Sequence, residues 1–373
     1  MIQPPVIQFE RRPGILDLGW GHPRPGLLPV EEWAAAGAEA ARTFGWQQLT
    51  YGHATGPAPL VDWLCAHLAD GTRFAQTFVT GGASHALALV ASLLAGPGDV
   101  ILVDSPTYHL AFRILADTGA TLRRMPGSPA ELAGLVRTIG RRVPFLYLVP
   151  TFGNPTGRSL DDARRRELIE VARREGLLLV EDDTYRELVY EGTAPPSLWE
   201  LSGGSGVVRL GSFAKTVAPG LRLGWVNAAP DLIGRLAGLG YVDSGGGVNH
   251  ATAVTMASFG TSGVYDRHVA RLRDAYRLQR DALVAAVRAH LPVEVPQGGW
   301  FLWVRLPGSF SGTRLLPPAE KAGVSFVPGT RFCVDDGDGD DHVRLSFSHL
   351  PPADLTEAAT RLGQLIATLP GHE

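Results

Sequence analysis

Residues 207–225 read VVRLGSFAKTVAPGLRLGW, and this stretch decides how the rest of the chain is interpreted. It begins as a β-rich run and enters a loop that holds Ser212, Lys215 and Arg222. The chain has 34 lysine and arginine residues, yet only Lys215 and Lys321 are lysines. Arginine keeps its proton near neutral pH, whereas lysine can become an amine nucleophile. Lys215 is therefore predicted to have a chemical role, and Lys321, in the polar helical stretch PPAEKAG, a solvated surface position.

Short β-rich runs alternate with helical segments between residues 76 and 228. The runs are QTFVT, DVILVD, FLYLVP, GLLLVED, VVRLG and LRLGWVNA. This alternation predicts an α/β fold in which helices cover both faces of a mainly parallel sheet. One connecting helix is expected at 161–175, where apolar residues repeat at helical spacing before Gly176. Its arginine run 164–166 is interpreted as a solvated helix face.

The character of the chain changes near residue 261. A long amphipathic helix, VYDRHVARLRDAYRLQRDALVAAVRAHL, is followed by predicted strands around GWFLWVRLP, VSFVPG and HVRLSFS and by a closing helix. This pattern indicates a smaller α+β unit. We expect an N-terminal arm at 1–44 that forms part of the small domain, a large domain at 45–260 and a small C-terminal domain at 261–373.

Composition excludes several classes of function. With 45% hydrophobic and 19% charged residues, the 373-residue chain has the composition of a globular protein. A net charge of -3 gives no basic surface for nucleic acid, and no apolar run predicts export or a membrane span. Cys65 and Cys333 lack the spacing of a zinc or redox site, and DDGDGDD (335–341) lacks the residues of a calcium loop. We expect a cytoplasmic protein without metal, membrane or nucleic-acid partners.

Further polar residues and glycines lie where predicted strands end. They are Asp182 and Tyr185 in GLLLVEDDTYREL, Asn154 in VPTFGNPTG, and Gly82, Ala83 and Ser84 in VTGGASHALAL. A glycine-rich turn that opens a helix offers free backbone N–H groups to an anion. Taken singly, each segment is equally compatible with an ordinary turn or helix cap. Because all of these segments occur in one chain, each near the end of a predicted strand, together they indicate a binding site more strongly than any one of them alone.

Together these segments resemble the motifs of fold-type I pyridoxal-phosphate (PLP) enzymes, the aspartate aminotransferase superfamily. The resemblance runs from near Gly19 to Arg344 and is strongest to class I/II aminotransferases related to aminoadipate aminotransferases, a group also found as the C-terminal part of MocR-type regulators. It implies a PLP-binding large domain with a mainly parallel sheet, a smaller α+β domain, and a homodimer with shared active sites. No DNA-binding segment precedes the match, so a regulatory role is not expected.

The resemblance also implies roles for individual residues. The implied catalytic residues are Lys215, which holds the cofactor as a Schiff base and acts as general base, Asp182, which pairs with the pyridine nitrogen, and Tyr185. The implied cofactor-binding residues are Tyr51, Gly82, Ala83, Ser84, Tyr108, Asn154, Asp182, Tyr185, Ser212, Lys215 and Arg222, with Tyr51 reaching the neighbouring subunit's cofactor. The implied substrate-binding residues are Asn154, Gly21 and Arg344, with Arg344 on the α-carboxylate.

The chain departs from the family pattern at several points. Ala83 stands where a serine or threonine is common, Trp20-Gly21-His22 replaces small residues in the segment that covers the substrate, and Gly153 replaces a longer side chain. The amino donor therefore stays open among aminoadipate, branched, aromatic and specialised amino acids.

The predicted reaction moves an amino group from an L-amino acid to a 2-oxo acid. The alternative is another PLP-dependent reaction at Cα, such as that of a lyase, decarboxylase, cyclase or oxidase. The spacing Ser212-x-x-Lys215 also fits serine β-lactamases and penicillin-binding proteins, but suitable Ser-Asp-Asn and Lys-Thr-Gly elements are missing. A nicotinamide dehydrogenase is disfavoured because no G-x-G-x-x-G turn follows an early strand.

Overall fold

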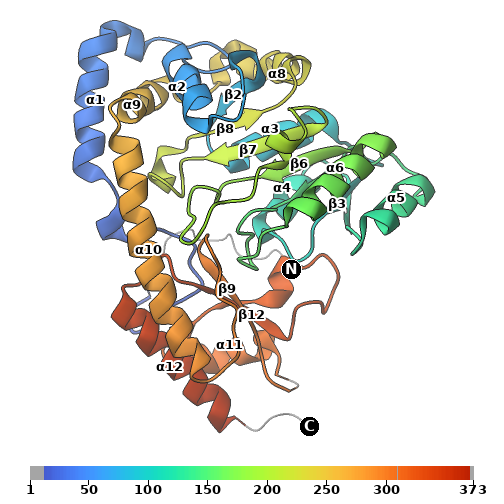
Figure 1. The fold of residues 1–373 in the computed structure, drawn as a ribbon, viewed down its shortest axis with the longest axis vertical. Helices are drawn as coiled ribbons and strands as arrows, with labels where there is room; N and C mark the ends of the chain where they lie inside the picture. The colour runs from blue at the N-terminus through green and yellow to red at the C-terminus, as the bar shows by residue number, and fades with distance from the viewer. Residues whose placement is uncertain (1–11, 309, 370–373) are drawn as a thin grey trace.

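A computed structural model describes residues 12–308 and 310–369 of the chain. Its centre is a seven-stranded sheet with the order β2-β8-β7-β6-β5-β3-β4 (Figure 1). The strands are β2 Thr77–Thr80, β3 Val100–Val103, β4 Thr121–Arg124, β5 Phe145–Leu148, β6 Leu178–Asp182, β7 Val207–Ser212 and β8 Gly224–Asn227. Only β8 opposes the other strands of this sheet, since it pairs antiparallel with both β2 and β7. The mainly parallel α/β sheet is confirmed, and β4 is a strand that the sequence interpretation missed.

Helices cover both faces of the sheet because successive strand residues point to opposite sides. In β3, Ile101 and Val103 face one apolar cluster, whereas Val100 and Leu102 face another. The first cluster includes residues of α3 Ala83–Leu94, α4 His109–Ala116 and α8 Pro230–Ala237. The second includes residues of α5 Pro129–Thr138, α6 Asp162–Glu175 and α7 Leu198–Leu201. The buried faces leave the strand ends as the accessible edge of the sheet.

Helix α6 corrects one sequence interpretation. It ends at Gly176 in a left-handed conformation, as expected, but Arg165 within the run 164–166 is fully buried and not part of a solvated face. The guanidinium of Arg165 donates to the carbonyl oxygens of Pro150, Leu160 and Pro196 and to the hydroxyl of Thr151. Buried loop carbonyls need donors, and a guanidinium supplies five N–H groups. Arg165 thus holds the start of the segment that carries Asn154.

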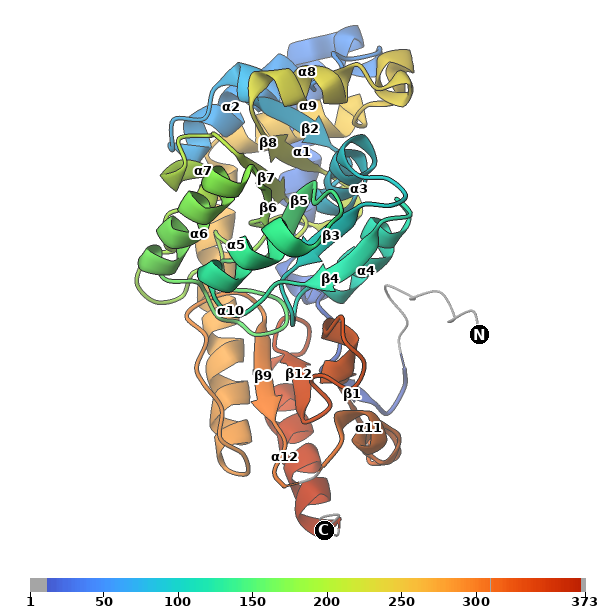
Figure 2. The same cartoon turned by 90° about the vertical axis from the view of Figure 1, so that its right-hand side faces the viewer.

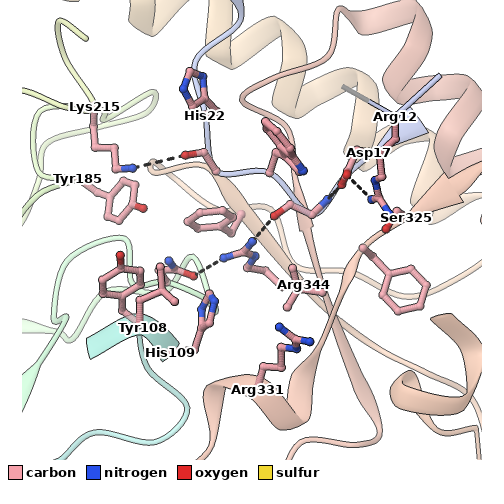
Figure 3. Close-up of a pocket in the computed structure, with 18 residues that line it drawn as sticks. Arg12, Asp17, His22, Tyr108, His109, Tyr185, Lys215, Ser325, Arg331 and Arg344 are labelled. Atoms are coloured by element: carbon pink, nitrogen blue, oxygen red, sulfur yellow. Dashed lines mark hydrogen bonds and ion pairs between the residues drawn. The ribbon is translucent and has the colours of Figure 1, made fainter. Parts of the chain in front are cut away.

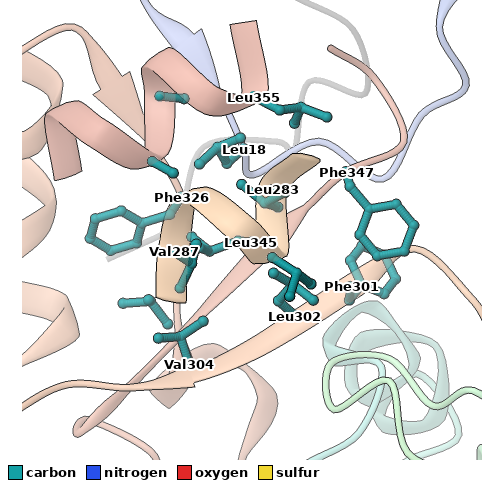
Figure 4. Close-up of a cluster of buried hydrophobic side chains, with 14 of the residues drawn as sticks. Leu18, Leu283, Val287, Phe301, Leu302, Val304, Phe326, Leu345, Phe347 and Leu355 are labelled. Atoms are coloured by element: carbon teal, nitrogen blue, oxygen red, sulfur yellow. The ribbon is translucent and has the colours of Figure 1, made fainter. Parts of the chain in front are cut away.

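The smaller unit is a three-stranded antiparallel sheet covered by helices. Its strands are β11 Val327–Pro328, β12 His342–Ser346 and β9 Phe301–Arg305, in that order, and its helices are α10 Val264–Arg288, α11 Gly312–Lys321 and α12 Pro352–Thr368. A separate short pair joins β1 Leu16–Asp17 to β10 Val324–Ser325 in parallel. Figure 4 shows the core of the smaller unit, where Leu283 and Val287 of α10 pack with Leu302 and Leu345.

Helix α10 contributes to two apolar cores. Its first turns place Tyr265 and Val269 in a cluster that includes residues of α1 Val30–Phe44, α2 Ala58–Leu68 and α9 His250–Thr261. Its later turns place Leu283 and Val287 in the small core, so one helix runs beside both units (Figure 1, Figure 2). The expected face of this helix, Val269, Leu272, Tyr276, Leu283, Val287 and Leu291, is buried throughout.

The N-terminal arm is divided between the two units. Its helix α1 packs on α9, whereas its strand β1 joins the small unit through β10. The domain limits near 44 and 260 stay a prediction. Within 12–308 and 310–369, no helix combines the length and apolarity needed to cross a bilayer, and no group of three or more His, Cys, Asp or Glu side chains is arranged to hold a metal ion.

Candidate active site

Two adjoining cavities lie where the strand ends meet the small unit and the N-terminal arm, and Figure 3 shows the residues that line the outer one. The inner cavity, about 570 Å³, is lined by residues that follow the sheet strands, and the outer cavity, about 260 Å³, by residues of the arm and the small unit. Both are lined by His22, Tyr108, Asn154, Tyr185 and Lys215. Parallel strands deliver their following loops to one edge, which is where α/β proteins bind ligands. The predicted residues Ala83, Ser84, Asp182, Ser212 and Arg222 also line the inner cavity.

Lys215 lies at the junction of the two cavities. Its Nζ lies 3.5 Å from the carbonyl oxygen of Gly21 and 4.6 Å from the ring centroid of Trp300. Burial lowers the pKa of Lys215 to about 8, and the charges of Arg344 and Arg222 act in the same direction. Half of the amine is then unprotonated near that pH, so Lys215 is available as a nucleophile and base.

Asp182 lies at the end of β6 on the floor of the inner cavity. The hydroxyl of Tyr147, on the neighbouring strand β5, donates to its Oδ2 at 2.9 Å, and the N–H of Thr184 reaches Oδ1 at 3.4 Å. Burial raises the pKa of Asp182, whereas the hydrogen bond from Tyr147 lowers it. A buried carboxylate held in this way is suited to pair with a protonated ring nitrogen. Tyr147 lies within a strand, where its sequence position gave no sign of this contact.

A candidate anion site lies at the start of α3. Gly82 precedes the helix with a φ of 94°, and Arg222 lies against it with its Nη2 donating to the Gly81 carbonyl at 3.1 Å. A Cβ on Gly82 would approach Arg222 Nη2 to 3.0 Å, so glycine permits this close approach. Ser212 ends β7 nearby on the same cavity wall. Free helix N–H groups, a guanidinium and a hydroxyl together suit a phosphate monoester.

Tyr108 and Tyr185 are the aromatic residues of the shared wall. Tyr108 directly precedes α4, and burial raises its pKa to about 12, so its hydroxyl stays neutral. The ring of Tyr185 packs edge-on against Trp300 and Phe301. Burial raises the pKa of Tyr185 as well, which keeps this hydroxyl a hydrogen-bond donor.

Arg344 reaches the cavities from β12. It is 4% exposed, and its Nη1 donates to the Asn154 side-chain oxygen at 3.0 Å while Nη2 donates to the Gly19 carbonyl. Its guanidinium lies 4.3 Å from the ring centroid of Phe301. Burial lowers the pKa of Arg344 to about 10. No carboxylate of the described residues forms an ion pair with it, so its charge is available to a substrate carboxylate.

The two remaining predicted residues, Gly21 and Tyr51, lie outside the inner cavity. Gly21 lines the outer cavity and offers its carbonyl oxygen to Lys215. Tyr51 lines neither cavity and is 88% exposed. Its ring lies beside Gly245, which belongs to a short π-helical turn at 242–246. The chain therefore brings all predicted site residues to or beside the cavities except Tyr51. The sequence interpretation missed Tyr147, Trp300, His109 and Arg331, since none belongs to a spaced motif.

The inner cavity fits PLP. Its walls carry an amine, a buried carboxylate and an anion site, which correspond to the aldehyde, the ring nitrogen and the phosphate of that cofactor. The amine follows β7, the carboxylate ends β6 and the anion site follows β2, so the fold fixes all three groups at one edge of the sheet.

The comparisons with known proteins agree with this geometry. The family model for aminotransferase class I and II matches residues 13–362, and the chain belongs to that family. It is 33% identical to a 2-aminoadipate transaminase of Thermus thermophilus, covering 98% of this chain and 93% of that one. It is 30% identical to aromatic-amino-acid aminotransferase 1 of Thermococcus litoralis, covering 97% and 90%.

A solved structure extends the likeness to the fold. An alpha-aminoadipate aminotransferase of Thermus thermophilus, complexed with N-(5'-phosphopyridoxyl)-L-leucine, matches with a TM-score of 0.84 and 31% identity, over 95% of this chain and 92% of that one. The chain is thus a PLP-dependent aminotransferase of the fold-type I class, whose substrates are amino acids and 2-oxo acids.

Proposed function

We propose that transamination in this enzyme depends on Lys215 as both the attachment point of PLP and the group that moves the substrate proton. The bound cofactor supplies an electron sink that weakens bonds at the substrate Cα. The observation that carries the proposal is the position of Lys215, a buried amine of lowered pKa at the junction of the two cavities. From there its Nζ can take the proton from Cα and deliver it again.

The surrounding residues orient the partners of this proton transfer. Arg344 holds the substrate α-carboxylate, and Asn154, which already accepts from Arg344, keeps the guanidinium in place. Asp182, braced by Tyr147, keeps the ring nitrogen of the cofactor protonated. Trp300 and the Gly21 carbonyl lie next to the lysine amine and limit access of water to it.

We further propose that two copies form the working enzyme. Tyr51 lies on an exposed surface together with Leu49 and Trp46, which are 82% and 74% exposed. Large apolar side chains gathered on a surface are typical of an interface. A second copy seated here brings its Tyr51 to the phosphate end of the inner cavity, so each site takes residues from both chains. The cytoplasm is the proposed compartment.

The central proposal is tested by the absorption of the bound cofactor before and after a panel of amino acids is added. The wild-type enzyme is expected to show a visible absorption band from the lysine-bound cofactor. Added amino acids are expected to abolish this band and to release a stoichiometric amount of 2-oxo acid. Lys215→Ala is expected to lack the band, and the control Lys321→Ala, at an exposed position of α11, to keep it. Release of CO₂ or consumption of O₂ in place of 2-oxo acid would contradict transamination.

Shared sites are tested by mixing variants. Lys215→Ala and Tyr51→Ala chains are inactivated at different places, so a mixed dimer regains one complete site when Tyr51 acts across the interface. Refolding an equal mixture is expected to restore roughly a quarter of wild-type activity. A mixture no more active than its parents would contradict the shared site, even when sedimentation shows a dimer.

A further inference from the structure

The amine of Lys215 lies against the face of an aromatic ring. Its Nζ is over the indole of Trp300, 4.6 Å from the ring centroid, and over the ring of Tyr185 at 5.7 Å (Figure 3). The Gly21 carbonyl oxygen lies 3.5 Å from the same nitrogen. An ammonium ion within about 6 Å of a ring centroid is attracted to the negative face of the ring, and tryptophan gives the strongest attraction. These neighbours favour the protonated amine in a place where burial opposes it.

Packing holds the indole of Trp300 in this position. The residue directly precedes β9 and is fully buried. Its carbonyl oxygen accepts from the Phe347 N–H at 3.0 Å, which ties its backbone to the end of β12. The rings of Tyr185 and Tyr276 pack edge-on against the indole, with centroids 5.9 and 5.6 Å away. The neighbouring rings therefore fix the orientation of the face that Lys215 meets.

The N–H of this indole carries a penalty that a purely apolar residue would avoid. Nε1 of Trp300 is buried and has no hydrogen-bond partner among the described residues. A buried donor without a partner destabilises the folded chain, whereas leucine, methionine or phenylalanine would fill a core position without that penalty. Tryptophan differs from all three in having the most electron-rich face, and this face is the part that meets Lys215.

The charged groups around Lys215 do not replace this attraction. Burial lowers the pKa of Lys215, Asp182 raises it, and Arg344 and Arg222 lower it further. His22 of the arm faces the same amine, and the Lys215 charge adds to the burial that lowers the pKa of this imidazole. Asp182 alone among these groups attracts an ammonium ion, and in the proposed function its charge is paired with the ring nitrogen of the cofactor. The indole face and the Gly21 carbonyl then remain to hold a protonated lysine.

We propose that Trp300 is a positioning residue that binds the protonated side chain of Lys215 whenever this lysine is not joined to the cofactor. The inference rests on the proposed function, in which Lys215 takes the proton from Cα and delivers it again. A lysine with that task must stay in place both as an amine and as an ammonium ion. A ring face attracts the ammonium ion but has no lone pair that would remove its proton, so the proton remains available to the substrate.

The proton affinity of Lys215 gives the first test, because Lys215 and Lys321 are the only lysines of the chain. The enzyme is labelled with ¹³C,¹⁵N-lysine and loaded with pyridoxamine 5'-phosphate, which cannot form a Schiff base and leaves Lys215 free. Lys321→Ala assigns the two side-chain signals, and a pH titration by NMR yields the pKa of Lys215. Trp300 is then replaced site-specifically by mono-, di- and trifluorotryptophan. Fluorine weakens the negative face but nearly keeps the volume of the ring, so the pKa of Lys215 is expected to fall stepwise, by about half to one pH unit in total.

The controls separate the ring face from general effects of substitution. Trp300→Leu would also open space to water, so the series with retained ring volume carries the test. The same fluorinated residues at Trp199, which is buried but lines neither cavity, are expected to leave the pKa of Lys215 unchanged. The signal of the exposed Lys321 is the internal reference. A Lys215 pKa that ignores fluorination at position 300, or responds equally to fluorination of Trp199, would overturn the proposal.

A rate profile separates this inference from the function beneath it. In single turnovers with an amino acid, the rate should rise with pH as Lys215 loses its proton, and fluorination of Trp300 should move this rise to lower pH by the same amount as the NMR pKa. A moved pKa with an unmoved rate profile would support the contact with Trp300 and contradict Lys215 as the base. An unmoved pKa in an enzyme that still releases 2-oxo acid would leave transamination intact and remove only the role of Trp300.

Discussion

The inner and outer cavities meet at Lys215 but are built from different parts of the chain. Apart from His22 of the arm, the inner cavity is formed by residues that end or follow strands β2, β3, β5, β6 and β7. The outer cavity is assembled from the arm, the start of α4 and several segments of the small unit, among them β9, β12 and the Gly329–Phe332 turn, which are far apart in sequence. The residues proposed to perform chemistry are thus tied to the sheet, whereas the residues proposed to contact the substrate depend on how segments far apart in sequence pack together. Variants of each group should therefore fail in different ways.

The largest loss of transamination rate is expected from substitution of Lys215, which lies where the two cavities meet. Lys215→Ala removes the proposed base, so the transamination rate should fall by about 10³-fold or more with every substrate. Steady-state release of 2-oxo acid checks this. Lys321→Ala is the matched control, and an equal fall in both variants would show that loss of a lysine, not of this lysine, is responsible.

The next effect concerns the support of the inner cavity. Arg165→Ala leaves three loop carbonyls and the Thr151 hydroxyl without their buried donor, and should lower the free energy of unfolding by about 3 kcal/mol. Arg166→Ala, at the adjacent exposed position, should change it by less than about 0.5 kcal/mol. Urea unfolding measures both. Similar values for the two would restore the interpretation of the run as a solvated face.

Arg344 lines the outer cavity, yet it is expected to bind the α-carboxylate that all amino acid substrates share. Arg344→Gln is expected to lower kcat/KM by about 100-fold for dicarboxylic and apolar amino acids alike. A loss confined to dicarboxylic substrates would assign the α-carboxylate elsewhere. Unfolding of the variant is measured in parallel, since Arg344 also holds Asn154 and Gly19.

The smallest expected effect is a shift in how the rate of PLP capture depends on pH. Because the pKa of Lys215 is lowered to about 8, cofactor-free enzyme should capture PLP about tenfold faster per pH unit below that value and level off above it. The Asp182 charge raises the pKa of Lys215, so Asp182→Asn should move the midpoint to lower pH. Stopped-flow absorption measures the capture rate. A midpoint near that of free lysine, or a shift upward in the variant, would contradict the electrostatic account.

Sequence alone predicted the inner cavity better than the outer one, for a physical reason. Asp182 and Ser212 end strands and Lys215 follows one, so their place in the sheet fixes their place in space. Arg331 and His109 come together through long-range contacts between residues 105–109 and 332–334, such as the hydrogen bond from the Thr107 N–H to the Phe332 carbonyl, which no local pattern encodes. The same limit explains Arg165, because an arginine in a polar run has no local sign of burial. It also explains Tyr147, whose hydroxyl is directed to Asp182 by strand register.

The scarcity of lysine has a practical consequence for handling the protein. Its two side-chain amines occupy opposite environments, one facing solvent on α11 and one within the cavities. When PLP is attached, the cavity amine is masked and Lys321 becomes the main side-chain target of amine-directed coupling. Coupling at Lys321 then tethers the holoenzyme through α11 of the small unit, away from the residues that line the two cavities.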